Sequence, residues 1–306
     1  LDNIAVAALE QRDAAAQEVG AAEHMVRSQL CANLRVHSGT LRDAAKMLGE
    51  IDVFLAKVQF AKENAGCVPR FSDTTLIEFT QARFLPLVTQ LQSQNRKYIP
   101  ISLRVQGVAL LSGPNMGGKS VALRTCGFLT LCASLGLPVP AARAKLVLFK
   151  EIVWIGVGID EGPAGLLSAF AKEVVRLSEL LVAKREPGLI LIDEFARTTN
   201  PREGRALLLA LIQTLRGRNV CALVATHLPG IAEKAGVPHF AVRGLHALPQ
   251  ELSPRNLDEA LALLATSMDY SISEVAQDAV GRADAIALAQ ILGLDQELVA
   301  AARKAL

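Results

Sequence analysis

The sequence predicts an α/β fold in which a mostly parallel sheet follows a helical amino-terminal region. Three observations lead to this prediction. Residues 1–64 are rich in Ala, Leu, Glu and Gln at helical spacing. From Val108 onward, short apolar runs typical of strands alternate with runs typical of helices, an order that favours a parallel sheet with helices on its faces. The chain has 306 residues, 51% of them hydrophobic, which is enough to fill a large core.

Each predicted element follows from a local pattern. Residues 1–64 predict long helices, and Gly20 and Gly39 are the only interior breaks before Met47. Residues 66–107 contain Gly66 and Pro69 and show few periodic signals. After them we expect strands at 108–113, 145–149, 151–158, 188–194 and 220–227, and helices from Lys119, from Leu166 to Ala183 and from Pro201. The sequence contains no internal repeats.

Charge gives little sign of a general affinity for nucleic acid. The chain has 32 Lys and Arg against 30 Asp and Glu. Residues 1–64 have seven basic and nine acidic side chains, a net charge of −2, whereas a segment that grips DNA is normally basic. A local basic patch elsewhere remains compatible with this balance.

Two further features favour the cytoplasm. The five cysteines form no CxxC pair, so we expect reduced thiols rather than a disulfide framework. The first residues lack the basic and apolar segments of a secretory signal. The longest uncharged run, residues 125–142, is interrupted by Gly136, Pro138 and Pro140, so a buried helix and loop explain it better than a membrane span. We therefore expect no membrane association.

The stretch GPNMGGKS after the strand at 108–113 predicts a phosphate-binding loop. It matches G-x-x-x-x-G-K-S and lies before a helix, which is the context that this pattern requires. Glycines let backbone amides surround phosphate oxygens, and the helix amino end adds its dipole. Lys119 is expected to reach the β- and γ-phosphates and Ser120 to bind Mg²⁺. The alternative is a glycine-rich turn without a ligand. The candidate nucleotide-binding residues are Gly113, Pro114, Asn115, Met116, Gly117, Gly118, Lys119, Ser120 and Val121.

The apolar run LILIDE predicts a strand that ends in two carboxylates. Asp193 and Glu194 would then lie at the carboxyl edge of the sheet, where ligands of such sheets bind. Asp193 can hold Mg²⁺ through water, and Glu194 can orient and deprotonate an attacking water. A solvated acidic strand end is the alternative, and the phosphate loop upstream makes it less favoured.

The run VCALVATH predicts a further strand, followed by His227. An imidazole at this place can hydrogen-bond the γ-phosphate or the attacking water. A single His at a strand end is more often structural. The ordered series of phosphate loop, acidic strand and strand-end His favours a catalytic role for His227.

Together, these motifs resemble the ATPase domain of the MutS family, within the ABC class of ATPases. The resemblance rests on GPNMGGKS, LLSAFAKEV, LILIDEFARTTNPREG and VATH, and extends from about Ile99 to the C-terminus. It implies ATP and Mg²⁺ as cofactors, and adenine rather than guanine. It also implies a helical core and lever region at 1–75, a P-loop ATPase domain at 76–265 and a helical dimerisation segment at 266–306.

The resemblance also implies a homodimer with composite ATP sites. Ser168 matches the signature serine that reaches the γ-phosphate bound by the opposite subunit, and Glu173 matches the acidic residue that follows it. The residues themselves equally predict Ser168 as the N-cap of an amphipathic helix, and both roles are compatible. The catalytic candidates are therefore Glu194, His227 and Ser168, and the metal candidates are Ser120 and Asp193.

One segment departs from the DNA-repair members of the family, which carry a Gly-Arg-Gly-Thr-Ser run. Here it is ARTTNPREG, in which the residues that match are Arg197, Thr199 and Gly204, and those that differ are Ala196, Thr198, Asn200 and Pro201. Asn200, Pro201 and Glu203 together predict a strong helix start. The variant resembles a MutS-like group linked to adenosylcobalamin-dependent lysine and ornithine aminomutases, which implies an ATPase that reactivates a mutase.

Three functions remain open from the sequence. The first is an ATP-driven remodelling factor for a protein client, such as a cobalamin-dependent aminomutase. The second is a mismatched-DNA-binding ATPase of the repair type, which the acidic residues 1–64 disfavour. The third is a nucleotide-binding scaffold without turnover, which the presence of Glu194 and His227 disfavours.

Overall fold

The computed structural model describes residues 3–114, 117–156, 168–245, 259–260, 264, 267–277 and 285–305. The chain divides into two compact units, Leu1–Gln59 and Phe60–Leu306. Each unit is described by itself. The boundaries predicted near residues 75 and 265 stay predictions.

The amino-terminal residues form two long helices, α1 (Asn3–Val36) and α2 (Ser38–Glu63). Helix α1 continues through Gly20, because a helical glycine costs only about 1 kcal/mol relative to Ala. The break lies at His37 rather than at either predicted glycine, and Gly39 lies inside the first turn of α2. Apolar side chains such as Met25 and Phe54 are exposed on these helices.

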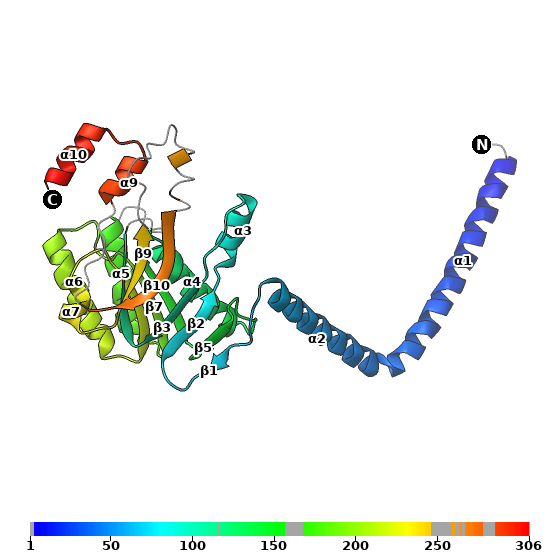
Figure 1. The fold of residues 1–306 in the computed structure, drawn as a ribbon. Coiled ribbons are helices and arrows are strands. Elements are labelled where there is room, and N and C mark those ends of the chain that lie inside the picture. The colour runs from blue at the N-terminus through cyan, green and yellow to red at the C-terminus, as the bar shows by residue number, and fades with distance from the viewer. Residues whose placement is uncertain are drawn as a thin grey trace. The chain divides into compact units, whose positions relative to one another are not determined.

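The main sheet has six strands in the order β10-β9-β4-β8-β7-β6 (Figure 1). Neighbouring strands are parallel from β9 to β6, and β10 is antiparallel to β9. The α/β prediction is confirmed, with a mixed rather than wholly parallel sheet. The strands are β4 (Val108–Ser112), β6 (Glu151–Gly156), β7 (Gly188–Asp193), β8 (Val220–Ala225), β9 (His239–Leu245) and β10 (Met268–Val275).

Helices cover both faces of this sheet. Side chains alternate along β7, so that Leu189 and Leu191 face one core cluster whereas Ile190 and Ile192 face the other. The first cluster contains α4 (Lys119–Ser134), and the second contains residues of α5 (Ala169–Ala183), α6 (Pro201–Arg216) and α7 (Ile231–Ala235). Strands buried on both faces explain the continuous apolar runs in the sequence.

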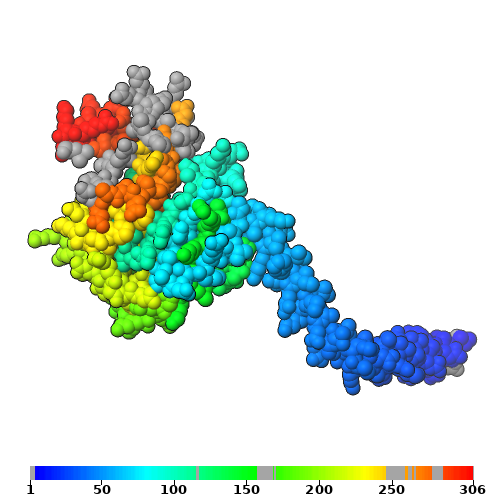
Figure 2. Space-filling view, turned by 60° about the horizontal axis from the view of Figure 1, so that its bottom comes forward, coloured from blue at the N-terminus to red at the C-terminus, as the bar shows by residue number. Residues whose placement is uncertain are grey.

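A second sheet packs beyond α4 and corrects one prediction. Its order is β1-β5-β2-β3, with β1 (Arg70–Phe71), β2 (Leu76–Ala82), β3 (Ile101–Gln106) and β5 (Arg143–Leu146). The run at 145–149 was expected in the parallel sheet, and this is wrong. Only its first residues belong to β5, an internal strand that pairs antiparallel with β2 and parallel with β1. Its buried residues Ala144 and Leu146 pack in the same core cluster as β2, which places the strand in the second sheet. Figure 2 shows β2 (cyan) beside β5 (green).

Strand β3 was missed, although its period-two pattern was present in the sequence. Ile101, Leu103 and Val105 are buried and alternate with exposed residues. Helix α3 (Leu85–Ser93) lies between β2 and β3 in the chain. The segment 66–107, which shows few periodic signals, therefore contributes most of this second sheet.

The carboxyl-terminal part contains α9 (Ala285–Ile291) and α10 (Gln296–Lys304). Leu288 and Ile291 of α9 pack in a small cluster with Leu245 and Met268. Asp295 caps α10 by accepting bonds from the backbone N–H groups of Glu297 and Leu298. No helix in the described part of the chain is long and apolar enough to cross a membrane.

The structure describes all five cysteines, and their reduced state stays a prediction. None of the cysteines forms a disulfide. Burial raises the pKa of Cys126 to about 12, so this thiol is unreactive near neutral pH. Cys31, in contrast, is exposed.

Gly156, in the edge strand β6 of the main sheet, leads to a prediction about stability. Its φ is +147°, and a Cβ there would lie 2.6 Å from the Asp193 carbonyl oxygen. We expect Gly156→Ala to lower the free energy of unfolding by about 1–3 kcal/mol, measured by denaturant titration. Gly217→Ala is the control, because its Cβ would meet only Thr214 O at 3.6 Å. Equal midpoints for both variants would contradict the expected clash.

Candidate functional site

The loop between β4 and α4 is a cradle of bare backbone. Gly113 has φ +144° and Gly118 has φ +95°. A Cβ on Gly113 would lie 3.0 Å from Val242, and one on Gly117 would lie 2.8 Å from the Pro114 carbonyl oxygen. Side chains are therefore excluded at these glycines, so the main chain can come close to a ligand, which fits a phosphate group. Asn115 and Met116, both predicted to bind nucleotide, lie outside the described residues.

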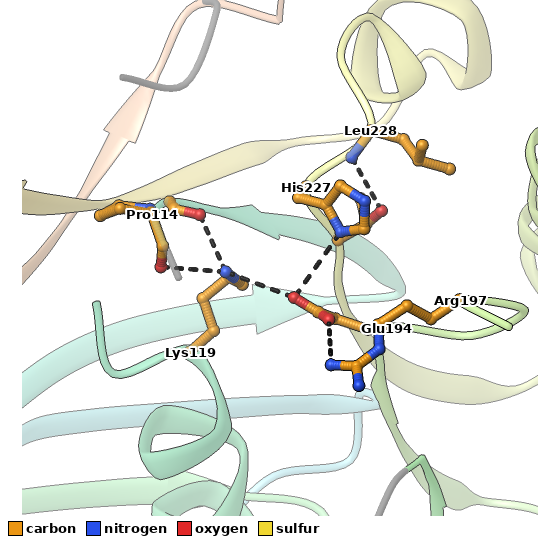
Figure 3. A network of polar contacts seen from close by, with 8 residues as sticks. Pro114, Lys119, Glu194, Arg197, His227 and Leu228 are labelled. Carbon is orange, nitrogen blue, oxygen red and sulfur yellow. Dashed lines mark hydrogen bonds and ion pairs between the residues drawn. The ribbon is translucent and has the colours of Figure 1, made fainter. Parts of the chain in front are cut away.

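Lys119 opens α4 and points back into the loop (Figure 3). Its Nζ donates to the carbonyl oxygens of Gly113, at 2.8 Å, and Pro114, at 3.0 Å. The same nitrogen lies 3.6 Å from Glu194 Oε1, and the side chain is only 5% exposed. Burial lowers the pKa of Lys119, while the carboxylates of Glu194 and Asp193 oppose this shift.

Glu194 lies in the turn that follows β7, at the carboxyl edge of the sheet. Its backbone N–H donates to Ala225 O at 3.0 Å, which ties the turn to β8. The carboxylate is largely buried and has three partners (Figure 3). Besides Lys119, these are His227 Nδ1 at 3.7 Å from Oε1 and Arg197 Nη1 at 3.4 Å from Oε2. The fold thus brings Lys119, Glu194 and His227 together.

Asp193 ends β7 and is buried, in register with Gly156 and Ala225 of the neighbouring strands. Ser120 lies in the first turn of α4. The described residues show no direct bond between the two side chains. Mg²⁺ at phosphates usually takes only one or two protein ligands and keeps water on the others. Hard oxygen donors near Lys119 fit such an ion.

His227 and Ser168 differ in how they lie. His227 follows β8 and its side chain is half-exposed. The turn after it is held by a hydrogen bond from Leu228 N to Thr226 Oγ1 at 3.1 Å. Ser168 is exposed and caps α5 by accepting from Ala171 N at 3.2 Å. Within one chain it shows no contact with the Glu194 group.

Val121, the last predicted nucleotide-binding residue, lies in the first turn of α4. Its carbonyl oxygen accepts a bond from Thr125 Oγ1 at 2.7 Å. The backbone of Val121 is therefore part of the first turns of α4. The nucleotide-binding role of Val121 stays a prediction.

The site contains Arg197, to which the sequence had assigned no role. Arg197 pairs with Glu194, which lies three positions earlier in the chain. That spacing is visible in the sequence, but the left-handed φ of Glu194, +54°, and of Ala196, +61°, is not. This turn geometry makes the pair possible.

Strands β9 and β10 support the loop from one side. The Tyr270 ring on β10 lies close to Gly118: a Cβ on this glycine would be 3.1 Å from the ring. The buried His239 bonds Ser112 Oγ through Nε2 at 2.7 Å, and its Nδ1 lies 3.1 Å from Ala276 O. A carbonyl oxygen only accepts, so Nδ1 donates in this bond. Neither residue was predicted, because no local pattern connects them to residues 112–118.

Comparison with known proteins agrees with this geometry. The family model MutS domain V matches residues 109–306. The chain is 32% identical over 262 residues to Endonuclease MutS2 of Carboxydothermus hydrogenoformans, covering 84% of this chain and 31% of that protein. It is 29% identical over 279 residues to Endonuclease MutS2 of Streptococcus suis strain 05ZYH33, covering 91% and 33%. The chain thus spans about a third of the length of these relatives. It belongs to the MutS family and carries domain V, the ATPase domain of that family.

Proposed function

We propose that this chain hydrolyses Mg²⁺-bound ATP at the Lys119–Glu194–His227 group, in a dimer whose ATP cycle remodels a client. The observation that carries the proposal is the 3.6 Å approach of Lys119 Nζ to Glu194 Oε1 beside the bare glycine loop. One cation for phosphate and one carboxylate for water therefore meet at a single edge of the sheet.

Lys119 is proposed to bind the β- and γ-phosphates. Its ammonium is held by two neutral carbonyl oxygens and one carboxylate in a buried position. A phosphate oxygen is a stronger, charged acceptor, and it also compensates the burial that lowers the Lys119 pKa. Bound Mg²⁺ supplies charge neutralisation at the phosphates, and Ser120 and Asp193 are the proposed protein ligands.

Glu194 is proposed to take the proton of the attacking water, with His227 orienting the water or the γ-phosphate. The carboxylate is buried, and its neighbours Lys119, Arg197 and His227 are all donors. A carboxylate in this place can accept a proton from a water beside the phosphate loop. A binding scaffold without turnover would not need this acceptor beside the loop.

The dimer proposal rests on Ser168. ATPases of this family generally dimerise. Ser168 is exposed at the amino end of α5, so both its hydroxyl and the helix dipole are available to an anion on another chain. We propose that it completes the ATP site of the partner subunit.

Two clients are proposed. The segment ARTTNPREG, through its resemblance to the mutase-linked group, is the basis for proposing a cobalamin-dependent aminomutase. Its helix start, in which Asn200 accepts from Arg202 N at 2.9 Å and Pro201 opens α6, follows from local capping and favours neither client. The relatives are named endonucleases, which supports DNA as the second client. The net charge of −2 over residues 1–64 favours the protein client.

The first prediction separates phosphate binding from chemistry. Lys119→Ala should weaken ATP binding by roughly 10- to 100-fold, because a charge-assisted contact is lost. Glu194→Gln should keep ATP affinity while kcat falls by roughly 10²- to 10⁴-fold, because the proton acceptor is lost. Equilibrium binding and steady-state turnover measure the two effects. Lys145→Ala, at an exposed position of β5, is the control and should change neither. Equal loss of affinity in Lys119→Ala and Glu194→Gln would contradict the assignment.

The second prediction tests the composite site with purified mixed dimers. A Lys119→Ala chain paired with a Ser168→Ala chain places both lesions in one site and leaves the other intact, so roughly half of wild-type turnover should return. The control pairs a wild-type chain with a chain that carries both changes; its lesions fall in different sites, so it should stay inactive. The opposite ranking of these two mixed dimers would show that Ser168 acts within its own chain.

The third prediction decides between the clients. A cobalamin-dependent aminomutase should change the ATP hydrolysis rate, because a remodelling ATPase must bind its client differently in its two nucleotide states. Matched and mismatched duplexes should bind equally weakly and be released as salt rises. Turnover with and without the mutase, and duplex titration at two salt concentrations, provide the measurement. Mismatch-selective binding that survives high salt, with no response to the mutase, would favour the repair-type function.

A further inference from the structure

A buried carboxylate joins helix α5 to the turn that carries Glu194. Glu173 is only 8% exposed, and its Oε2 accepts from the backbone N–H of Ala196 at 2.9 Å. Burial raises the pKa of Glu173, whereas the Ala196 N–H and the charge of Arg197 lower it. Burying a carboxylate is costly unless it is well bonded, so this contact calls for an explanation.

The turn needs such a contact because its backbone is unfavourable. Glu194 has φ +54° and Ala196 has φ +61°, a region that residues other than glycine rarely occupy. Inside the turn, the backbone bonds from Arg197 N to Glu194 O and from Thr199 N to Ala196 O are long, at 3.3 and 3.2 Å. Ala196 is buried, so its N–H would have no water to bind if Glu173 were removed.

Packing encloses the same turn from two helices. The Phe170 ring of α5 lies 6.4 Å, centroid to centroid, from the Phe195 ring. Gly204 of α6 lies so close that a Cβ there would be 3.2 Å from Ala196 O. Contacts from α5 and α6 therefore surround the residues directly after Glu194, and Glu173 provides the directional contact among them.

We propose that Glu173 is a positioning residue for ATP hydrolysis, which holds the strained turn so that the Glu194 carboxylate stays between Lys119 and His227. This inference rests on the proposed role of Glu194. Glu173 acts on the turn after β7, whereas the phosphate cradle belongs to the β4–α4 loop. Its loss should therefore affect the chemical step and spare nucleotide binding.

The test compares two substitutions of similar size. Glu173→Met keeps side-chain length and helix propensity but removes the acceptor. We expect its kcat to fall by roughly 10- to 100-fold, because small displacements of a catalytic group are costly, while KM for ATP stays within about 2-fold. Glu173→Gln retains an oxygen that can accept the Ala196 N–H, so its kcat should stay within about 3-fold of wild type.

Two controls make the outcome specific. Leu180→Ala removes packing from the buried side of α5 without touching the turn, so it should lower the melting temperature but preserve kcat when assayed well below that temperature. Glu194→Gln in the same assay tests the proposed function separately: full turnover there would remove the role of Glu194, and the positioning role with it.

The inference is overturned if, with Glu194→Gln inactive, Glu173→Met keeps wild-type kcat. It is also overturned if Glu173→Gln is as slow as Glu173→Met, or if Leu180→Ala slows turnover equally. Should Glu173→Met not fold, Glu173→Ala replaces it, since it also removes the acceptor, and the same criteria apply.

Discussion

The contact between Lys119 and Glu194 is the interaction on which the site depends. Both side chains are largely buried, and the charge of each offsets the cost of burying the opposite charge of the other. Lys119 follows β4 and its loop, and Glu194 follows β7; these two strands are not neighbours, because β8 lies between them. The strand between them leads into His227, so three consecutive strands of the sheet supply the three groups.

This arrangement requires close approach of main chain at two places. At the phosphate loop, the glycines keep side chains away from the space above α4, and β9 and β10 press against the loop from one side. At the end of β7, the Asp193 carbonyl oxygen lies so close to Gly156 that a Cβ on this residue would clash with it. Glycine thus serves at both places where the backbone must come close, and close-packed helices on both faces of the sheet hold the strands that carry them.

The turn after β7 shows how strain at a site is supported from outside it. Two non-glycine residues in left-handed conformation are retained because α5 and α6 surround them. Helix α5 is also capped by Ser168, the residue proposed to reach a second chain. One rigid helix therefore connects the proposed subunit contact with the turn that positions Glu194.

Local sequence determined much of this protein, where neighbouring residues alone decide the chemistry. Three features each depend on residues only a few positions apart, so each pattern is complete in the sequence: the glycine loop before Lys119, the apolar strand before Asp193 and Glu194, and the cap at Asn200. The period-two pattern of β3 was equally complete but was overlooked. Only the tertiary structure decided that Arg143–Leu146 pairs in the second sheet, that Tyr270 lies against Gly118 and that Glu173 bonds Ala196. These contacts join residues 23 or more positions apart, and which partner a strand edge or a buried carboxylate finds depends on how the layers pack.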